Sequence, residues 1–233
     1  MRLLISVMDA AEAVEAAGAG AHIIDVKDPA MGALGAAAPQ SVREVRKTIL
    51  PELPVSAALG DGPFQADAAA AAASALTDAG ADFVKLGLRD TSSDGALALL
   101  RHVAAGLPET VHLIAVGFAD FHRVRSLHPL ELPALAEAAG AHGCLIDTAV
   151  KDGRGLLHWL DKAALHSYVA QCRSRRLISA LAGSLMPADL PLLAHMGLDI
   201  LGVRGAACTG ADRVRGRVSR ERVAALLRAL PGR

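Results

Sequence analysis

Hydrophobic positions along the chain follow two alternating patterns. Short runs of aliphatic and β-branched residues are separated by Ala- and Leu-rich segments in which apolar residues recur about every 3.6 positions. The short runs predict buried strands, and the longer segments predict amphipathic helices. The predicted strands are Leu3–Val7, His22–Val26, Pro54–Leu59, Asp82–Leu88, Val111–Phe118, His142–Asp147, Leu177–Ala182 and Asp199–Val203.

The segments between these strands carry start and stop signals of helices. Asp94 and Ser219 are of the residue types that cap helix starts, and Gly106 and Gly140 follow helical runs where a left-handed residue is favoured. The predicted helices are Asp9–Ala19, Gln65–Ala79, Asp94–Ala105, Pro129–Ala139, Leu157–Arg173, Pro187–Met196 and Ser219–Leu230.

The alternation of strand and helix predicts a parallel α/β fold. Eight such units in 233 residues suit a (β/α)8 TIM barrel near its minimal length, so we expect a single catalytic domain over residues 1–233. A doubly wound open sheet is the alternative. No G-x-G-x-x-G follows an early strand, which argues against a dinucleotide site in such a sheet.

Composition and charge exclude several classes of protein. Hydrophobic residues make up 52% of the chain, which excludes a disordered protein. Lys plus Arg and Asp plus Glu number 24 each, so there is no basic field to hold nucleic acid or an anionic membrane. No apolar run reaches the ~18 residues that span a bilayer. We therefore expect a soluble, cytoplasmic protein that acts on a small molecule.

Neither cysteine nor histidine spacing indicates a metal. Cys144, Cys172 and Cys208 form no C-x-x-C pair, and the nine histidines show no H-E-x-x-H or Cys/His cluster. We expect no metal, no cofactor and no disulfide framework.

Acids and amines gather at the predicted carboxyl ends of the strands, where barrel enzymes place their chemistry. Because side chains alternate along a strand, Asp25 and Lys27 face the same side. Lys85 stands in an otherwise apolar strand, and Asp147 ends another strand shortly before Lys151. We expect these five residues at the mouth of the barrel.

Lysine is otherwise rare in this chain. Only five of its 24 basic residues are lysines, and three of those five are at the predicted mouth. Salt bridges that close the barrel are the structural alternative. Neighbouring ammonium groups and partial burial lower a lysine pKa, which yields an amine able to attack a carbonyl. The pattern thus favours Schiff-base chemistry, with the aspartates moving protons.

Small residues end the last two strands. Gly183 and Ser184 follow the seventh, and Gly202, Arg204 and Gly205 end the eighth. Exposed N–H groups there predict a phosphate site, with tight strand-to-helix packing as the alternative.

Three weaker signals lie in the loops. The arginine-rich segment 212–217 suits either a second phosphate or a solvated loop. Asp120 is expected to cap a helix, although it or His122 can reach the mouth, and Asp61 in a Gly-rich turn can face substrate.

Five blocks of sequence together resemble a known family. They are Asp25–Pro29, Val84–Leu88, Leu145–Gly153, Leu181–Leu185 and Gly202–Gly205, in that order. The chain resembles, over nearly its whole length, the (5-formylfuran-3-yl)methyl phosphate synthase family of methanofuran biosynthesis.

This resemblance implies a reaction and residue roles. Two molecules of glyceraldehyde 3-phosphate would condense to a furan aldehyde phosphate with loss of phosphate and water. Lys27 would form the imine, assisted by Asp25, Lys85, Asp147 and Lys151, with Lys85 as the second candidate for the imine.

The alternatives are another phosphosugar barrel, such as a Schiff-base aldolase or an epimerase, and a non-catalytic barrel that binds a phosphometabolite. A homo-oligomer is expected.

Overall fold

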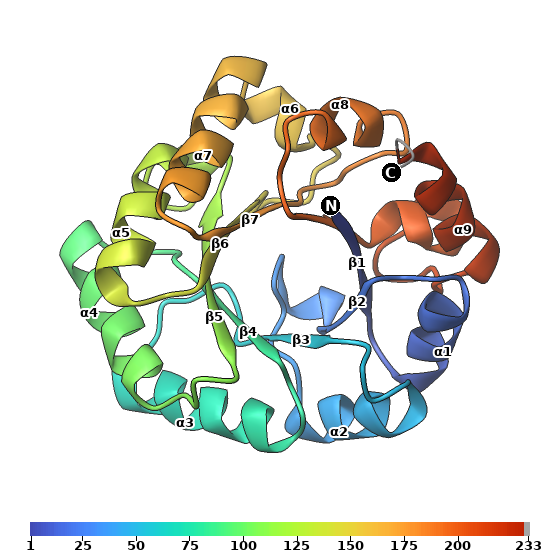
Figure 1. The fold of residues 1–233 in the computed structure, drawn as a ribbon, viewed down its shortest axis with the longest axis horizontal. Coiled ribbons are helices and arrows are strands. Elements are labelled where there is room, and N and C mark those ends of the chain that lie inside the picture. The colour runs from blue at the N-terminus through green and yellow to red at the C-terminus, as the bar shows by residue number, and fades with distance from the viewer. Residues whose placement is uncertain (231–233) are drawn as a thin grey trace.

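The computed structural model describes residues 1–230, and these form a closed barrel of eight parallel strands (Figure 1). Each strand pairs with the next along the chain, and the last pairs with the first, so the predicted TIM barrel is confirmed. The strands are β1 Arg2–Val7, β2 Ile23–Val26, β3 Val55–Ala58, β4 Phe83–Gly87, β5 His112–Phe118, β6 Gly143–Asp147, β7 Ile178–Leu181 and β8 Ile200–Val203.

Helices surround the barrel on its outside (Figure 1). They are α1 Ala10–Gly18, α2 Pro39–Thr48, α3 Ala66–Asp78, α4 Ser93–Ala105, α5 Leu132–Ala139, α6 Leu156–Trp159, α7 Lys162–Ser174, α8 Leu190–Ala194 and α9 Arg220–Ala229. The predicted helix over 157–173 is two helices, because Asp161 caps α7 by accepting from the N–H of Ala164 at 2.8 Å. The segment predicted as a helix over 187–196 forms only the short α8.

Two of the expected helix-end signals were wrong. Ser92, not Asp94, caps α4 and accepts from the N–H of Gly95 at 3.2 Å, while Asp94 lies in the first turn. Gly106 has a φ of −94° and so is not left-handed, whereas Gly140 ends α5 at a φ of 75°, as expected.

The strands bury both of their faces. Inward-facing residues such as Ile23, Phe83 and Ile114 fill the barrel interior. Their outward neighbours, such as Ile24 and Val84, pack with the helices in a second, larger core. Because apolar side chains fill the interior, polar side chains are left to the layer above it, at the carboxyl ends of the strands.

The amino end of the barrel repeats one hydrogen bond four times. The residue directly before each even-numbered strand is His or Asp, and its side chain accepts from a backbone N–H of the preceding strand. The four pairs are His22 with Leu3 at 3.0 Å, Asp82 with Val55 at 2.7 Å, His142 with Leu113 at 3.2 Å and Asp199 with Ser179 at 2.8 Å.

None of the helices within residues 1–230 combines the length and the apolar character needed to cross a membrane.

Candidate active site

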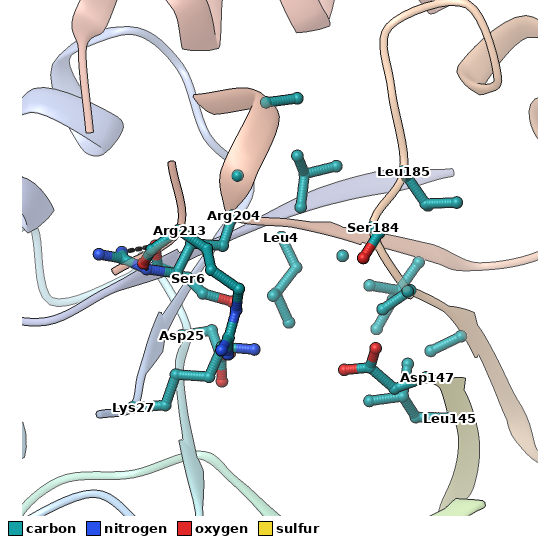
Figure 2. Close-up of a pocket in the computed structure, with 18 of the residues that line it drawn as sticks. Leu4, Ser6, Asp25, Lys27, Leu145, Asp147, Ser184, Leu185, Arg204 and Arg213 are labelled. Atoms are coloured by element: carbon teal, nitrogen blue, oxygen red, sulfur yellow. Dashed lines mark hydrogen bonds between the residues drawn. The ribbon is translucent and has the colours of Figure 1, made fainter. Parts of the chain in front are cut away.

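A cavity of about 380 Å³ opens at the carboxyl ends of the strands (Figure 2). It lies directly above the apolar side chains of the barrel interior. All ten of the predicted site residues line it: Asp25, Lys27, Lys85, Asp147, Lys151, Gly183, Ser184, Gly202, Arg204 and Gly205.

Two of the three lysines at the mouth are ion-paired. Lys85 Nζ lies 2.6 Å from Asp25 Oδ1, and the other oxygen of Asp25 accepts from the Ser6 hydroxyl at 2.9 Å. Lys151 Nζ lies 2.6 Å from Asp147 Oδ1. Both carboxylates are buried, and each is within hydrogen-bond distance of its lysine.

Lys27 differs from these two lysines in its partner. Its Nζ donates to the backbone carbonyl of Ala33 at 3.1 Å, and it forms no ion pair with any residue in 1–230. Burial lowers the pKa of Lys27 to about 7, with the charge of Lys85 acting in the same direction and Asp147 and Asp25 opposing it. A large fraction of Lys27 is therefore a neutral amine at pH 7, and a neutral amine can donate to a carbonyl while keeping its lone pair.

Asp147 is a carboxylate at neutral pH. Burial by itself would raise the pKa of Asp147, but the charges of Lys151 and Lys27 and the hydrogen bonds from Lys151 and Thr148 lower it below its usual value. Asp147 can therefore accept a proton at the cavity wall.

Two aspartates clamp the loops that carry the site. Asp61 accepts from the N–H groups of Ala33 and Leu34 at 3.0 and 2.8 Å, which fixes the carbonyl that binds Lys27. Asp120 is fully buried and accepts from the N–H groups of Ala149 and Val150 at 2.6 and 2.9 Å, next to Lys151.

These contacts correct two expectations. Asp120 makes no side-chain hydrogen bond at a helix start, so the predicted cap was wrong. Asp61 lies against the loop after β2 and is not among the residues that line the cavity. Gly32 makes the first clamp possible, because a Cβ there would lie 2.3 Å from Asp61 Oδ2.

Free backbone donors lie in the loops after β7 and β8, which line the cavity. Within residues 1–230, no hydrogen bond engages the N–H groups of Gly183, Ser184, Gly205 and Ala206. Gly183 and Ser184 both have positive φ, at 112° and 50°, a conformation that turns successive N–H groups outward. We call these four N–H groups the amide cradle; such donors suit a phosphate dianion.

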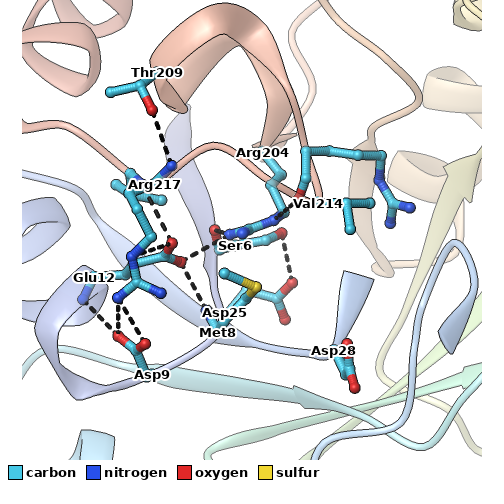
Figure 3. A network of polar contacts seen from close by, with 12 residues as sticks. Ser6, Met8, Asp9, Glu12, Asp25, Asp28, Arg204, Thr209, Val214 and Arg217 are labelled. Carbon is cyan, nitrogen blue, oxygen red and sulfur yellow. Dashed lines mark hydrogen bonds and ion pairs between the residues drawn. The ribbon is translucent and has the colours of Figure 1, made fainter. Parts of the chain in front are cut away.

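Arg204 is already engaged within the protein (Figure 3). Its Nη1 donates to Glu12 Oε2 and to the Ser6 carbonyl, both at 2.9 Å, and the side chains of Arg204 and Glu12 are 3% and 1% exposed. The guanidinium thus ties the end of β8 to α1. Phosphate binding by Arg204 stays a prediction.

Sequence reasoning missed two serines of the cavity and left the place of Arg213 open. Ser6 and Ser56 line the cavity. Ser56 is the polar residue of an otherwise apolar strand, and Ser6 follows the apolar run Leu3–Ile5 in β1, which is the signal that could have found them. Ser56 Oγ is buried and has no hydrogen-bond partner among residues 1–230. Arg213 also lines the cavity, although its segment suited a solvated loop equally well.

No group of three or more His, Cys, Asp or Glu side chains among residues 1–230 is arranged to hold a metal ion. The three cysteines are free and buried.

A closed (β/α)8 barrel with buried amines and carboxylates at its carboxyl end defines the class of TIM-barrel enzymes. Residues 3–227 match the model of the 4-HFC-P synthase family, and the chain belongs to that family. It is therefore an enzyme, and the non-catalytic alternative no longer applies.

Relatives of known name agree with this placement. The chain is 42% identical over 226 residues to the (5-formylfuran-3-yl)methyl phosphate synthase of Methanothermobacter thermautotrophicus, with 96% of each chain covered. It is 40% identical over 227 residues to the enzyme of that name from Methanocaldococcus jannaschii, covering 96% of this chain and 97% of the relative. The phosphoribosyl anthranilate isomerase of Thermus thermophilus matches with a TM-score of 0.67, 17% identity and 98% of both chains covered, which shows the shared fold alone.

Proposed function

We propose that this enzyme condenses two molecules of glyceraldehyde 3-phosphate into (5-formylfuran-3-yl)methyl phosphate, with loss of phosphate and water, in the biosynthesis of methanofuran or an analogue. Membership of the 4-HFC-P synthase family and the name of its relatives support the product. The observation that carries the mechanism is Lys27, a buried amine without an ion-pair partner in residues 1–230.

Lys27 forms the imine in this proposal. Its neutral form attacks the aldehyde carbon, and the resulting carbinolamine loses water to give the imine. The imine withdraws electrons from the adjacent carbon, so that carbon loses a proton and the resulting enamine attacks the second aldehyde. The Ala33 carbonyl supports this role because it orients the amine without stabilising a charge on it as a carboxylate would.

The two ion pairs supply the proton transfers. Asp147 and Asp25 are placed to accept protons, and Lys151 and Lys85 to donate protons to departing hydroxide or phosphate. Such groups typically contribute about 10²–10⁴-fold each. The Ser56 hydroxyl, which has no partner in the part of the chain that the structure describes, suits a substrate hydroxyl or carbonyl oxygen.

The amide cradle binds the phosphate of the first substrate molecule in this proposal. Its four N–H groups need no side-chain cation, in keeping with the engagement of Arg204 by Glu12. A cytoplasmic homo-oligomer remains the expected form of the enzyme.

Borohydride trapping tests the proposed function. The protein is incubated with glyceraldehyde 3-phosphate and borohydride, the adduct is mapped by peptide mass spectrometry, and phosphate release without borohydride is assayed in parallel. We expect an adduct on Lys27 and released phosphate, whereas a simple aldolase would retain both phosphates.

Two lysine variants control this experiment. Lys27→Arg replaces the amine with a guanidinium that cannot form an imine, so the adduct should vanish. Lys47→Arg changes a lysine of α2 on the outside of the barrel and should leave the adduct unchanged. An adduct on Lys85 would reassign the nucleophile, and the absence of both adduct and released phosphate from folded protein would contradict the proposed function.

A further inference from the structure

Arg213 reaches across the mouth of the barrel from the loop after β8. Its Nη1 donates to the carbonyl of Pro29 and its Nη2 to that of Gly32, both at 2.8 Å, so it contacts the loop after β2. In Figure 2 its side chain extends into the cavity on the same side as Lys27, whereas Ser184 lies on the opposite side. The Arg213 side chain and the Ser184 part of the amide cradle therefore lie on different sides of the cavity, whereas Gly205 of the cradle lies near the base of the Arg213 side chain, because a Cβ at Gly205 would lie 3.9 Å from Arg213 Cβ.

The guanidinium of Arg213 retains unused donors. It has five N–H groups, and the carbonyls of Pro29, Gly32 and, at 3.4 Å, Ala33 occupy at most three of them. At least two N–H groups therefore remain, and each can donate to a phosphate oxygen.

The positive charge of Arg213 is also unpaired. Lys85, Lys151 and Arg204 each form a close ion pair with a carboxylate, but Arg213 forms none with any residue that the structure describes. Burial lowers the pKa of Arg213, while Asp147 and Asp61 oppose that effect from a distance. A guanidinium stays protonated under such conditions, so the cavity holds one permanent cation that lacks an anion.

The neighbouring arginines do not share this position. Arg217 pairs with Asp9 and Glu12 on the outer side of the β8 loop (Figure 3). Arg215 is exposed and is not among the residues that line the cavity. The placement is thus particular to Arg213 and is not a general property of a basic loop.

We propose that Arg213 forms a second phosphate site, separate from the amide cradle, so that the cavity holds two phosphorylated substrate molecules at once. The ligand class is a phosphate monoester dianion. The identity of that ligand as glyceraldehyde 3-phosphate rests on the proposed function, whereas the existence of two phosphate sites does not. Two anchored phosphates would hold the imine carbon chain and the second aldehyde in one cavity, which favours their condensation over release of a single triose.

Titration with inorganic phosphate tests the two sites without turnover. Calorimetry of the full-length protein should give two phosphate ions bound per chain. Arg213→Gln should weaken one of them by ~10-fold or more, since a charge-assisted contact is lost, and leave the other unchanged. Arg215→Gln, two positions along the same loop, should keep both sites at full affinity.

Other outcomes of the titration would overturn the proposal. A single phosphate in the wild-type protein, two sites of unchanged affinity in Arg213→Gln, or loss of both sites in that variant would each do so. Arg213→Lys keeps the positive charge but has three N–H donors instead of five. It should therefore retain the second site at an affinity between those of wild type and Arg213→Gln.

Turnover separates this proposal from the proposed function. Arg213→Gln should still form the borohydride-trapped Lys27 adduct, but product formation should need ~10-fold more glyceraldehyde 3-phosphate. If wild type forms no adduct, the proposed function fails while the phosphate count stands. If the adduct forms and product formation by Arg213→Gln depends on substrate as in wild type, the second site fails alone.

Discussion

Both ends of the barrel carry polar side chains, but these side chains have different partners at the two ends. At the amino end, His22, Asp82, His142 and Asp199 each accept from a backbone N–H. At the carboxyl end, the lysines and aspartates contact mainly one another. A backbone partner cannot titrate, so the amino end stabilises the barrel. Titratable neighbours shift each other's pKa, so the carboxyl end acquires reactive groups.

Lys27 shows the same contrast within the carboxyl end. It has a backbone partner, Ala33, but lies among charged neighbours. The backbone contact orients its amine, and burial beside Lys85 lowers its pKa. Lys27 is therefore suited to react, because its amine is held in one orientation and its pKa is lowered.

Removing the Lys27 amine should have the largest effect. Lys27→Arg should lower turnover by about 10⁴-fold or more, because an arginine cannot form the imine. The fold should persist, because arginine also has a long aliphatic stem to pack at this position. Phosphate release measures turnover, and thermal melting shows whether the fold persists. Turnover within 10-fold of wild type would contradict the role of Lys27.

Removing the charge of Lys85 should shift the pH dependence of imine formation. The Lys85 ammonium helps to lower the pKa of Lys27, so in Lys85→Gln that pKa should rise and trapping at Lys27 should need a higher pH. The readout is the pH midpoint of adduct formation, because the amplitude also reflects any proton transfer by Lys85. An unchanged or lower midpoint would show that Lys85 does not tune Lys27.

The Asp120 clamp should affect stability and activity more moderately. Asp120→Asn keeps one acceptor but turns an amide donor toward the N–H of Ala149 or Val150, which costs about 1–3 kcal/mol of unfolding free energy. Turnover should fall by about 10-fold as Lys151 loses its position, since a general acid or base contributes at least this much. Urea unfolding and steady-state kinetics provide the test.

Asp152→Asn is the matched control for this clamp. Asp152 lies next to Lys151, but within residues 1–230 its side chain has polar contacts only with the exposed Arg123 and Arg154. Its substitution should leave both the free energy of unfolding and the turnover near their wild-type values. Equal effects in the two variants would mean that the Asp120 clamp has no special role.

The smallest effect is expected at the amino end. Burial and the nearby His112 lower the pKa of His142 in the folded protein, so the unfolded chain binds its proton more tightly. The stabilisation by neutral His142 is full above the unfolded pKa near 6.5 and declines as the pH falls below it. His142→Asp copies the acceptor that Asp82 provides and should reduce the loss of stability between pH 7 and about pH 5. Urea unfolding midpoints of wild type and His142→Asp at these two pH values test this prediction. An identical loss of stability in the two proteins would contradict the proposed effect of His142 protonation.

Local patterns predicted the parts of the site that depend on strand position. The two-residue alternation predicted Asp25 and Lys27 on one side. The lysine within β4 and the aspartate at the end of β6 indicated Lys85 and Asp147, which line the same cavity. The closed barrel follows from the regular alternation of strand and helix, because each unit packs against the next.

Contacts between distant parts of the chain could not be predicted in the same way. Glu12, the partner of Arg204, lies 192 residues away in the sequence, and no pattern near either residue indicates the pair. Asp61 and Asp120 bind backbone groups of other loops, which any carboxylate could do from several positions. The distinction among Arg213, Arg215 and Arg217 depends on the path of the β8 loop, which the sequence pattern leaves open.

The most direct test of the central claim is the pH dependence of the mapped borohydride adduct in the wild-type protein. The account predicts trapping at Lys27 with a midpoint near pH 7, because the amine that reacts has a pKa of about 7. A midpoint near the ordinary lysine value of 10.5, or an adduct mapped to Lys85 or Lys151, would contradict it.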